Sequence, residues 1–403
     1  MGNPGNPAQA VDYNPFGPKE MADPGTAHSQ LVRECPVHHF EGHGFEFYSL
    51  SRYSDVLDAL RDIETYSSHW GQSPHRTPPH GMLSDPPQHT MFRRMVLQAF
   101  TPRVVERMEP WIERLADELV DQMEATGTRT AELHDDFACP LPVITIARIL
   151  GVPEEMKDQF KYWSDIQVAG MGQIDRSIYE KNRKELEDYF IVLLNERRAL
   201  RSAGKAMPED LISALVLAAE DAPRKIEDFD MLSVLLQLLV GGNETTTSLI
   251  TNCVWRLLER RELWEQVCAN PALVEVAVEE SLRFDAPVLG LFRTNTCPVT
   301  LHGVEIPADS KVHLLYSAAD RDASVFEDPD TFRLDRDPDF LRRRSLAFGS
   351  GIHFCLGAPL ARLESRLALS ALVRRMPTLE LNGPTERIEP FLLYGRHRLP
   401  VRW

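Results

Sequence analysis

Residues 348–357 read Phe-Gly-Ser-Gly-Ile-His-Phe-Cys-Leu-Gly and stand directly before a predicted helix over Pro359–Arg375. The three glycines of this segment permit a tight, irregular backbone and the close approach of a flat ligand. Cys355 lies just before the helix N-terminus, where the helix dipole and nearby backbone N–H groups favour a thiolate. The pattern therefore indicates a cysteine that is able to act as a thiolate ligand.

Two neighbours of the cysteine suit a flat ligand that carries acidic groups. Phe348 is placed to pack beneath a macrocycle, and His353 is placed to reach a carboxylate. The alternative is a buried structural cysteine in a glycine-rich turn, because free cysteines are among the most buried residues. The pattern FGxGxHxCxG fixes six positions, so a chance match is rare and the ligand hypothesis is favoured.

This pattern resembles the haem-binding loop of the cytochrome P450 family, with every fixed position present. The resemblance implies a bacterial, soluble haem-thiolate monooxygenase in which Cys355 ligates the iron of haem b (iron protoporphyrin IX). It places Phe348, Gly349, His353 and Gly357 around the haem. A thiolate donates electron density to iron and favours O–O cleavage. The implied fold is mainly α with a small β portion (α+β), with the haem between a long central helix and the C-terminal cysteine loop and helix.

Helical periodicity predicts that long helix from about Asp228 to Arg260, roughly 50 Å in length. Its centre reads Gly241-Gly-Asn-Glu-Thr-Thr-Thr247, which are weak helix formers. The residues alone predict a widened turn there, with a close crossing of two elements as the alternative. By resemblance, Gly242 leaves room for dioxygen, Thr245 hydrogen-bonds the bound oxygen species and Glu244 relays protons. Cleaving O–O heterolytically requires two protons in a dry pocket.

Glu280 and Arg283 lie three residues apart on a predicted helix over 273–285 and share the face that carries its apolar side chains. The pattern predicts an inward-pointing ion pair, with a solvated surface pair as the alternative. By resemblance this is the ExxR pair that supports the cysteine loop. The third arginine that the family often adds is replaced by Thr331, so the third partner of the pair stays open.

The two haem propionates need cationic partners or hydrogen-bond donors. The segment from Asp85 to Arg94 resembles the family's helix across the haem edge, in which His89 and Arg93 point together at i, i+4 spacing. Arg293 follows a predicted strand over Val288–Phe292 and matches another propionate contact. With His353 this gives four candidates, each of which would otherwise be an ordinary surface residue.

The substrate pocket, by resemblance, draws on residues 66–84, 167–178, 235–245, 287–292 and 391–394. Its apolar members predict an apolar small organic substrate of the terpenoid, aromatic, steroid or fatty-acid class. The predicted pocket residues are Leu235, Leu239, Val288, Leu289, Leu291, Phe391 and Leu392.

The rest of the chain predicts one domain over residues 1–403, with residues 1–30 extended over the surface. Further helices are predicted at 53–60, 104–124, 142–150, 178–201 and 210–219, and short strands at 45–50, 299–301 and 311–316. Residues 317–346 are predicted to form an irregular meander. The N-terminus has no leader pattern and no apolar run is long enough to cross a bilayer, which predicts a cytoplasmic protein.

Charge and cysteines restrict the partners. The net charge is −16, which disfavours nucleic acid and anionic membranes, and the six cysteines have neither zinc nor disulfide-scaffold spacing. No dinucleotide fingerprint or four-cysteine cluster appears, so we expect a separate ferredoxin and ferredoxin reductase. Arginines gather near the cysteine loop and predict a docking patch for an acidic ferredoxin, with a solvated arginine face as the alternative. They are Arg94, Arg103, Arg342, Arg343, Arg344, Arg362 and Arg366.

Two other functions remain open on the same scaffold. One is peroxide-driven oxidation, which does not need the proton relay of Glu244 and Thr245. The other is a haem protein that binds gas or recruits a partner without turnover. The presence of Cys355, Thr245 and the Glu280–Arg283 pair favours dioxygen-dependent monooxygenation over both.

Overall fold

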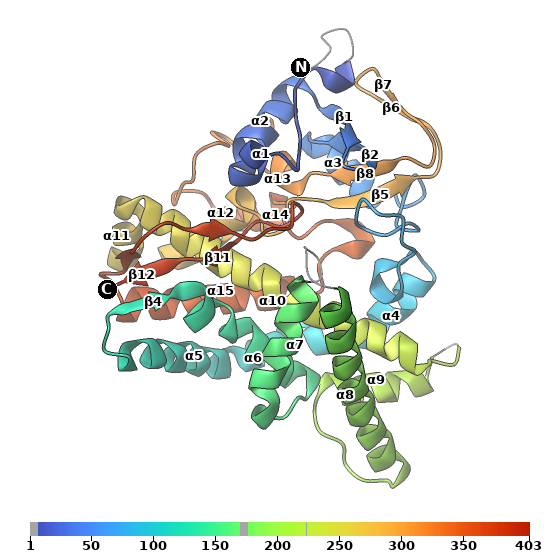
Figure 1. Cartoon of the computed structure of the whole chain (residues 1–403), viewed down its shortest axis with the longest axis vertical. Coiled ribbons are helices and arrows are strands. Elements are labelled where there is room, and N and C mark those ends of the chain that lie inside the picture. Colours follow the sequence, from blue (N-terminus) through green and yellow to red (C-terminus); the bar gives the residue numbers. More distant parts are fainter. Residues whose placement is uncertain (1–6, 170–175, 223) are drawn as a thin grey trace.

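The computed structural model describes residues 7–169, 176–222 and 224–403. Its helices make up most of the molecule, and its strands form several small sheets (Figure 1). The α-helices are α1 (Pro18–Ala22), α2 (Pro24–Glu34), α3 (Tyr53–Arg61), α4 (Gln88–Leu97), α5 (Pro102–Ala125), α6 (Pro140–Leu150), α7 (Lys157–Ala169), α8 (Arg176–Ser202), α9 (Leu211–Glu220), α10 (Asp228–Glu259), α11 (Arg261–Ala269), α12 (Leu273–Phe284), α13 (Tyr316–Ala319), α14 (Pro338–Arg344) and α15 (Ala358–Arg375).

The largest sheet has five strands in the order β1-β2-β8-β5-β3, antiparallel except where β2 pairs with β8. β5 carries Leu291 and Arg293 from this sheet to the centre of the molecule. The strands are β1 (Val37–Gly42), β2 (Phe45–Leu50), β3 (Tyr66–Ser67), β4 (Thr130–Glu132), β5 (Leu291–Asn295), β6 (Val299–Leu301), β7 (Val304–Ile306), β8 (Lys311–Leu314), β9 (Glu380–Leu381), β10 (Glu386–Arg387), β11 (Arg396–Arg398) and β12 (Pro400–Arg402).

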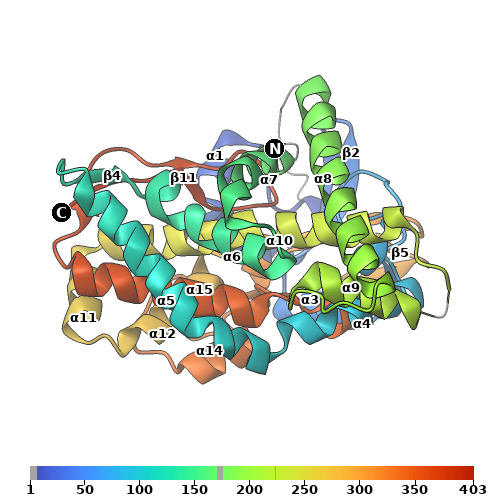
Figure 2. The same ribbon diagram turned by 90° about the horizontal axis from the view of Figure 1, so that it is seen from below.

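The long helix α10 crosses the centre of the molecule, and the other helices pack around it (Figure 1). α5 and α15 lie side by side on one side of α10, and α6 packs against α10 as well (Figure 2). A capping box fixes its start: Glu227 accepts from the backbone of Asp230, and the Asp230 carboxylate accepts from the backbone N–H of Glu227. Acidic groups at this end also suit the helix dipole.

Most predicted elements agree with the structure to within a few residues, including the helices at 53–60 and 178–201 and the strands at 45–50 and 299–301. The mainly helical fold with a small β portion is therefore confirmed. No helix in the described ranges has both the length and the apolar composition that crossing a bilayer requires.

The predicted extended N-terminus, residues 1–30, is wrong from residue 18 onward, because α1 and α2 occupy residues 18–22 and 24–34. Pro18 and Pro24 both stand at the first helical position, where the fixed φ of proline suits a helix and no N–H is missed. The carboxylate of Asp23 caps α2 by accepting from Thr26 N. The prolines that suggested an extended segment are therefore helix starts.

Two predictions around the cavity are also wrong. α10 is an α-helix throughout, without the widened turn predicted at Gly241–Thr247. The strand predicted at Val288–Phe292 begins only at Leu291, and Gly290 before it lies so close to Leu314 O that any side chain there would overlap that oxygen. Val288 makes only an isolated bridge to Leu393.

The side chains of Glu280 and Arg283 are both completely buried and form a two-pronged ion pair, with Arg283 Nη2 2.7 Å from Glu280 Oε1. The third partner is Arg336, whose Nε donates to Glu280 Oε1 at 3.1 Å. It comes five residues after Thr331, at which the sequence lacks an arginine. Arg283 donates in turn to the carbonyls of Asp320, Pro329 and Thr331, so the pair holds the segment that follows α13.

Replacing Glu280 by Gln is expected to destabilise the fold by about 3–5 kcal/mol, since it leaves the buried Arg283 charge without a counter-charge. Chemical denaturation measures this change. Glu180→Gln, which breaks the exposed Arg176–Glu180 pair on α8, is the control and is expected to leave stability unchanged. Equal midpoints for the two variants would contradict the role of the buried pair.

Candidate functional site

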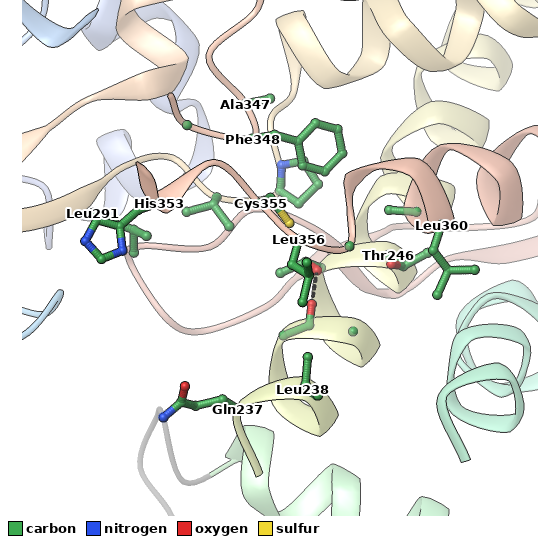
Figure 3. A pocket seen from close by; sticks show the side chains of 18 of the residues that line it. Gln237, Leu238, Thr246, Leu291, Ala347, Phe348, His353, Cys355, Leu356 and Leu360 are labelled. Carbon is green, nitrogen blue, oxygen red and sulfur yellow. Dashed lines mark hydrogen bonds between the residues drawn. The ribbon is translucent and has the colours of Figure 1, made fainter. Parts of the chain in front are cut away.

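A cavity of about 300 Å³ lies between α10 and the segment that runs from Ala347 to the start of α15. α6, β5 and the short 3₁₀ helix Gly81–Leu83 complete its wall (Figure 3). Most of its lining is apolar, with a few polar side chains at defined places. Such a cavity suits a largely apolar ligand that a small number of polar contacts orient.

Cys355 lies in the wall of this cavity, three residues before α15. Its backbone N–H donates to Phe348 O at 3.0 Å and closes the loop between them. Burial raises the pKa of the Cys355 thiol, while the N–H groups of Gly357 and Ala358 and the charges of Arg93 and Arg362 act in the opposite direction. The surroundings of the sulfur therefore supply donors and positive charge that stabilise a thiolate once a cation binds it.

Glycines give the cysteine loop its shape. Gly349 and Gly351 have φ of +69° and +70°, in the left-handed region that other residues avoid. A Cβ on Gly351 would also lie 2.7 Å from Leu60 O, at the end of α3. Gly357 has ordinary backbone angles, and a Cβ there would lie 4.0 Å from Cys355 Sγ. The glycines thus bring the backbone close both to α3 and to the sulfur.

One face of α10 lines the cavity at helical spacing: Leu238, Gly241, Gly242, Thr245, Thr246 and Leu249. The Thr245 hydroxyl donates to Gly241 O at 2.7 Å, one turn earlier. A Cβ on Gly242 would be in ordinary contact with Ile146 of α6, at 3.6 Å. Glu244 does not line the cavity; its carboxylate is half-buried and accepts from Ser248 Oγ at 3.2 Å.

Three of the four predicted propionate contacts, Arg93, Arg293 and His353, line the cavity, and the fourth, His89, lies against His353. The rings of His89 and His353 are 4.4 Å apart, and neither ring nitrogen of His89 has a hydrogen-bond partner in the described part of the chain. Burial lowers the pKa of His353 to about 3, with Arg293, His89 and Arg93 adding to the effect. Arg293 is 2% exposed, and its guanidinium donates to Phe292 O.

The predicted substrate pocket is only partly placed in this cavity. Val288 and Leu291 line it. Leu235 and Leu239 are fully buried and do not line the cavity, and the backbone N–H of Leu289 donates to Leu392 O. Phe391 and Leu392 pack in a separate aromatic cluster around Phe292. The contribution predicted from residues 167–178 lies partly outside the described residues.

Among the lining residues, Met82, Leu83, Gln237 and Leu238 fall in the predicted segments 66–84 and 235–245 but were not singled out, and Ile146 and Glu364 lie outside the predicted segments. Gln237 donates to His80 O at 2.8 Å and accepts from Met82 N at 3.2 Å, so it ties the 80–83 segment to α10 (Figure 3). Leu238 was within reach of sequence reasoning, because it lies one turn before Gly242 on the same face. Glu364 gave no such signal, since nothing in a helix sequence marks a buried acid.

Comparison with known proteins shows what the chain is similar to. The sequence profile of the cytochrome P450 family matches residues 167–391. The cytochrome P450 monooxygenase PikC of Streptomyces venezuelae is 35% identical over 98% of this chain and 94% of its own. The crystal structure of PksS from Bacillus subtilis has a TM-score of 0.85 at 31% identity, covering 97% of this chain and 99% of that one. A Bacillus megaterium cytochrome P450 solved with corticosterone has a TM-score of 0.82 at 33% identity, covering 95% and 99%.

The chain belongs to the cytochrome P450 family. It is a monooxygenase of that family, and bacterial members are among its relatives.

The residues of this cytochrome P450 fit the haem that the family implies. The propionate candidates provide the test. Neither Arg93 nor Arg293 forms an ion pair with any described residue. Both ring nitrogens of the buried His89 also lack a hydrogen-bond partner among the described residues. Guanidinium groups that donate only to backbone carbonyls, beside a buried imidazole whose nitrogens have no partner, call for an anionic ligand. Two propionates supply that charge, and Cys355 supplies a sulfur ligand in the same cavity.

The arginines near the cysteine loop of the cytochrome P450 divide into two groups. Arg342, Arg362 and Arg366 are held in ion pairs with Glu275, Glu279 and Glu109. Arg343 is 69% exposed and only 3.9 Å from Asp337, and for Arg94, Arg103 and Arg344 the described ranges show no ion pair. The basic patch is therefore smaller than the sequence predicted, because acidic residues of α5 and α12 neutralise part of it.

Proposed function

We propose that this cytochrome P450 binds haem b through Cys355 and hydroxylates an apolar small organic molecule, with electrons from separate proteins. The observation that carries the proposal is the cavity itself, which joins Cys355, three of the propionate candidates (Arg93, Arg293 and His353) and the Thr245 face of α10 in one space, with His89 against His353. When bound, haem supplies the iron centre at which dioxygen is activated. The remaining tasks fall to the side chains of this chain.

Binding and orientation divide between the two sides of the cavity. Cys355 holds the iron from the loop, and Phe348 packs beside it. Arg362 lies over the Phe348 ring at 4.6 Å and is itself held by Glu279. Arg93, Arg293, His89 and His353 hold the propionates. Gly349 and Gly357 let the backbone of the loop approach a flat group. Gly242, which has no side chain, leaves space on the α10 side of the cavity.

Proton handling falls to α10. The Thr245 hydroxyl faces the cavity and is positioned by Gly241 O. Glu244 lies on the partly exposed side of the same turn, where it exchanges protons with solvent and with the Ser248 hydroxyl. In this arrangement Glu244 collects a proton outside the cavity and Thr245 presents one inside it.

The substrate class follows from the wall opposite the cysteine loop. Met82, Leu238, Val288 and Leu291 are apolar, which favours burial of a hydrocarbon surface. Among the terpenoid, aromatic, steroid and fatty-acid classes, the steroid class has support from the relative solved with corticosterone. Side chains from Ala8 to Val401 belong to one hydrophobic cluster, which supports a single domain. All six cysteines are free, which supports a cytoplasmic location.

Spectroscopy tests the thiolate ligand. The ferrous carbon monoxide complex of the purified protein is expected to show the red-shifted Soret band of a thiolate-ligated haem. Cys355→Ser should lose that band while the fold is kept, and Cys297→Ser, at an exposed position, is the matched control. A spectrum like that of a histidine-ligated globin in the wild type would sink the proposal.

Thr245→Ala is expected to divert electrons from product to peroxide and water, because the cavity loses the hydroxyl that delivers protons. The measurement is product formed per reducing equivalent consumed. Thr245→Ser should retain coupling, and Thr247→Ala, which lies off the cavity wall, is the matched control. Unchanged coupling in Thr245→Ala would remove Thr245 from the mechanism.

Docking of an acidic ferredoxin is proposed at the exposed arginines that no close ion pair neutralises, with Arg343 and Arg344 at its centre. Reversing both charges to Glu should slow reduction of the haem by an acidic ferredoxin at low ionic strength, and the difference should shrink as salt rises. Arg176→Glu combined with Lys184→Glu, on the exposed side of α8, changes the net charge by the same amount and is the control. A reduction rate equal to that of this control would place docking elsewhere.

A further inference from the structure

A second cleft opens where the C-terminal end of α10 meets α2 and the segment 394–396. Its volume is about 530 Å³, which is enough for a small organic molecule. None of the described residues that line it also lines the cavity of Cys355. Four arginines and three aromatic rings form much of its wall. They are Arg33, Arg256, Arg321 and Arg396, with Trp255, Phe284 and Tyr394.

The acidic side chains of this cleft already have partners. Asp23 caps α2, because its carboxylate accepts from Thr26 N and from the Thr26 hydroxyl. The other two acids form ion pairs with three of the four arginines. These pairs are Arg33–Asp330 at 3.5 Å, Arg321–Asp330 at 3.3 Å and Arg256–Glu259 at 2.8 Å. The described residues therefore leave no carboxylate of the cleft free to bind a cation.

Arg396 is the arginine of the cleft that forms no ion pair within the described ranges. It is 6% exposed, and its Nη2 atom donates to the Tyr394 hydroxyl at 2.9 Å. Its buried Nε atom has no hydrogen-bond partner in the described part of the chain. Burial raises the pKa of Tyr394, so the hydroxyl stays neutral and does not cancel the charge of Arg396.

Two aromatic rings hold the guanidinium of Arg396 in place. Its Cζ atom lies 3.6 Å from the centre of the Trp255 ring and 5.0 Å from the centre of the Tyr394 ring. The ring faces attract a cation, but they give no acceptor to the N–H groups in the plane of the guanidinium. The charge is therefore stabilised by the rings, while its hydrogen-bonding capacity is only partly used.

The backbone that carries Arg396 is fixed by buried hydrogen bonds. Arg396 N donates to Thr251 Oγ1 at 3.3 Å, and Asn252 Nδ2 donates to Tyr394 O at 2.8 Å. Tyr394 N donates in turn to Pro287 O at 2.9 Å. A ligand would thus meet a guanidinium that is already positioned, which lowers the entropy cost of binding.

We propose that this cleft binds a small molecule that carries a carboxylate or a phosphate group, with the oxyanion against the guanidinium of Arg396. The planar fork of a guanidinium matches two oxygens of either group. Arg321 lines the same cleft, and its buried Nε atom also lacks a partner among the described residues, so it adds a second donor. Because the net charge of −16 repels anions in general, a bound anion requires such a local site.

Thermal unfolding of the haem-loaded protein tests binding. The haem-loaded form is used so that added anions do not bind at Arg93 and Arg293. Inorganic phosphate and succinate are titrated separately at constant ionic strength, with chloride as the reference anion. At least one of the two oxyanions is expected to raise the melting temperature in a saturable way, because a ligand that binds only the folded state stabilises it.

Substitution of Arg396 tests the position of the site. Arg396→Met keeps an unbranched side chain between the two rings but removes the charge, and it is expected to weaken anion binding about tenfold or more. Arg398→Met removes an exposed charge from the same strand, β11, and is the matched control that should bind like the wild type. If Arg396→Met does not fold, Arg396→Lys, which keeps the charge but loses the planar fork, should still bind more weakly than Arg398→Met.

Nuclear magnetic resonance of the Arg396 Nε–H group locates the ligand. Its signal, assigned by its absence from the Arg396 variant, should shift over the same anion concentrations that raise the melting temperature. A response to phosphate alone assigns the site to phosphate groups, and a response to succinate alone assigns it to carboxylates. Equal anion binding by the Arg396 and Arg398 variants, or no saturable effect of either anion on the wild type, would overturn the inference.

Discussion

A continuous chain of buried hydrogen bonds connects α12 to the cysteine loop, and the position of the site depends on it. Glu280 holds Arg283, and Arg283 donates to Asp320 O at 3.0 Å. The Asp320 carboxyl accepts from Leu346 N at 2.7 Å and from the Ser345 hydroxyl. Leu346 is the residue before the wall of the cavity begins. A buried ion pair is a weak source of stability, but removing one partner is costly, so it fixes geometry strongly.

The parts of this hydrogen-bonded chain and of the site that depend on short sequence motifs were predicted correctly from the sequence. The cysteine loop, the Thr245 face and the Glu280–Arg283 pair were all visible as fixed spacings. Arg336 was not, because a guanidinium reaches its partner along a flexible side chain, and its position in sequence can shift by several residues while its charge reaches the same carboxylate. Thr331 therefore stands where the family's sequence motif has an arginine, while Arg336 provides the guanidinium that contacts Glu280.

The apolar side chains of the predicted substrate pocket show why the lining of the cavity was harder to predict. Leu235 and Leu239 are as apolar as Leu238, yet only the last faces the cavity. Leu235 lies one turn before Leu238 and Leu239 lies one residue after it, and apolar periodicity cannot tell side chains that pack on protein from side chains that pack on ligand. Phe391 and Leu392 belong to an aromatic cluster with Phe292 for the same reason. Which apolar surface stays open is settled by the packing of distant segments.

α10 shows how such a site is sustained against local preference. Two adjacent glycines and three threonines at its centre cost the helix several kcal/mol relative to alanine, by roughly 1 kcal/mol for each glycine and less for each threonine. The helix remains continuous because both of its ends are anchored: the capping box at Glu227 fixes one end, and buried side chains such as Leu249, Val254 and Leu257 fix the other. The anchored ends thus keep the helix continuous through its weak centre. Because Gly241 and Gly242 have no side chains, they leave space that forms part of the cavity. Thr245 partly repairs the same weakness, since its hydroxyl bonds back to Gly241 O while it faces the cavity. Thr245 therefore stabilises the helix and is also placed for the reaction. For this reason helix propensity alone could not distinguish a weak point of the helix from a functional segment.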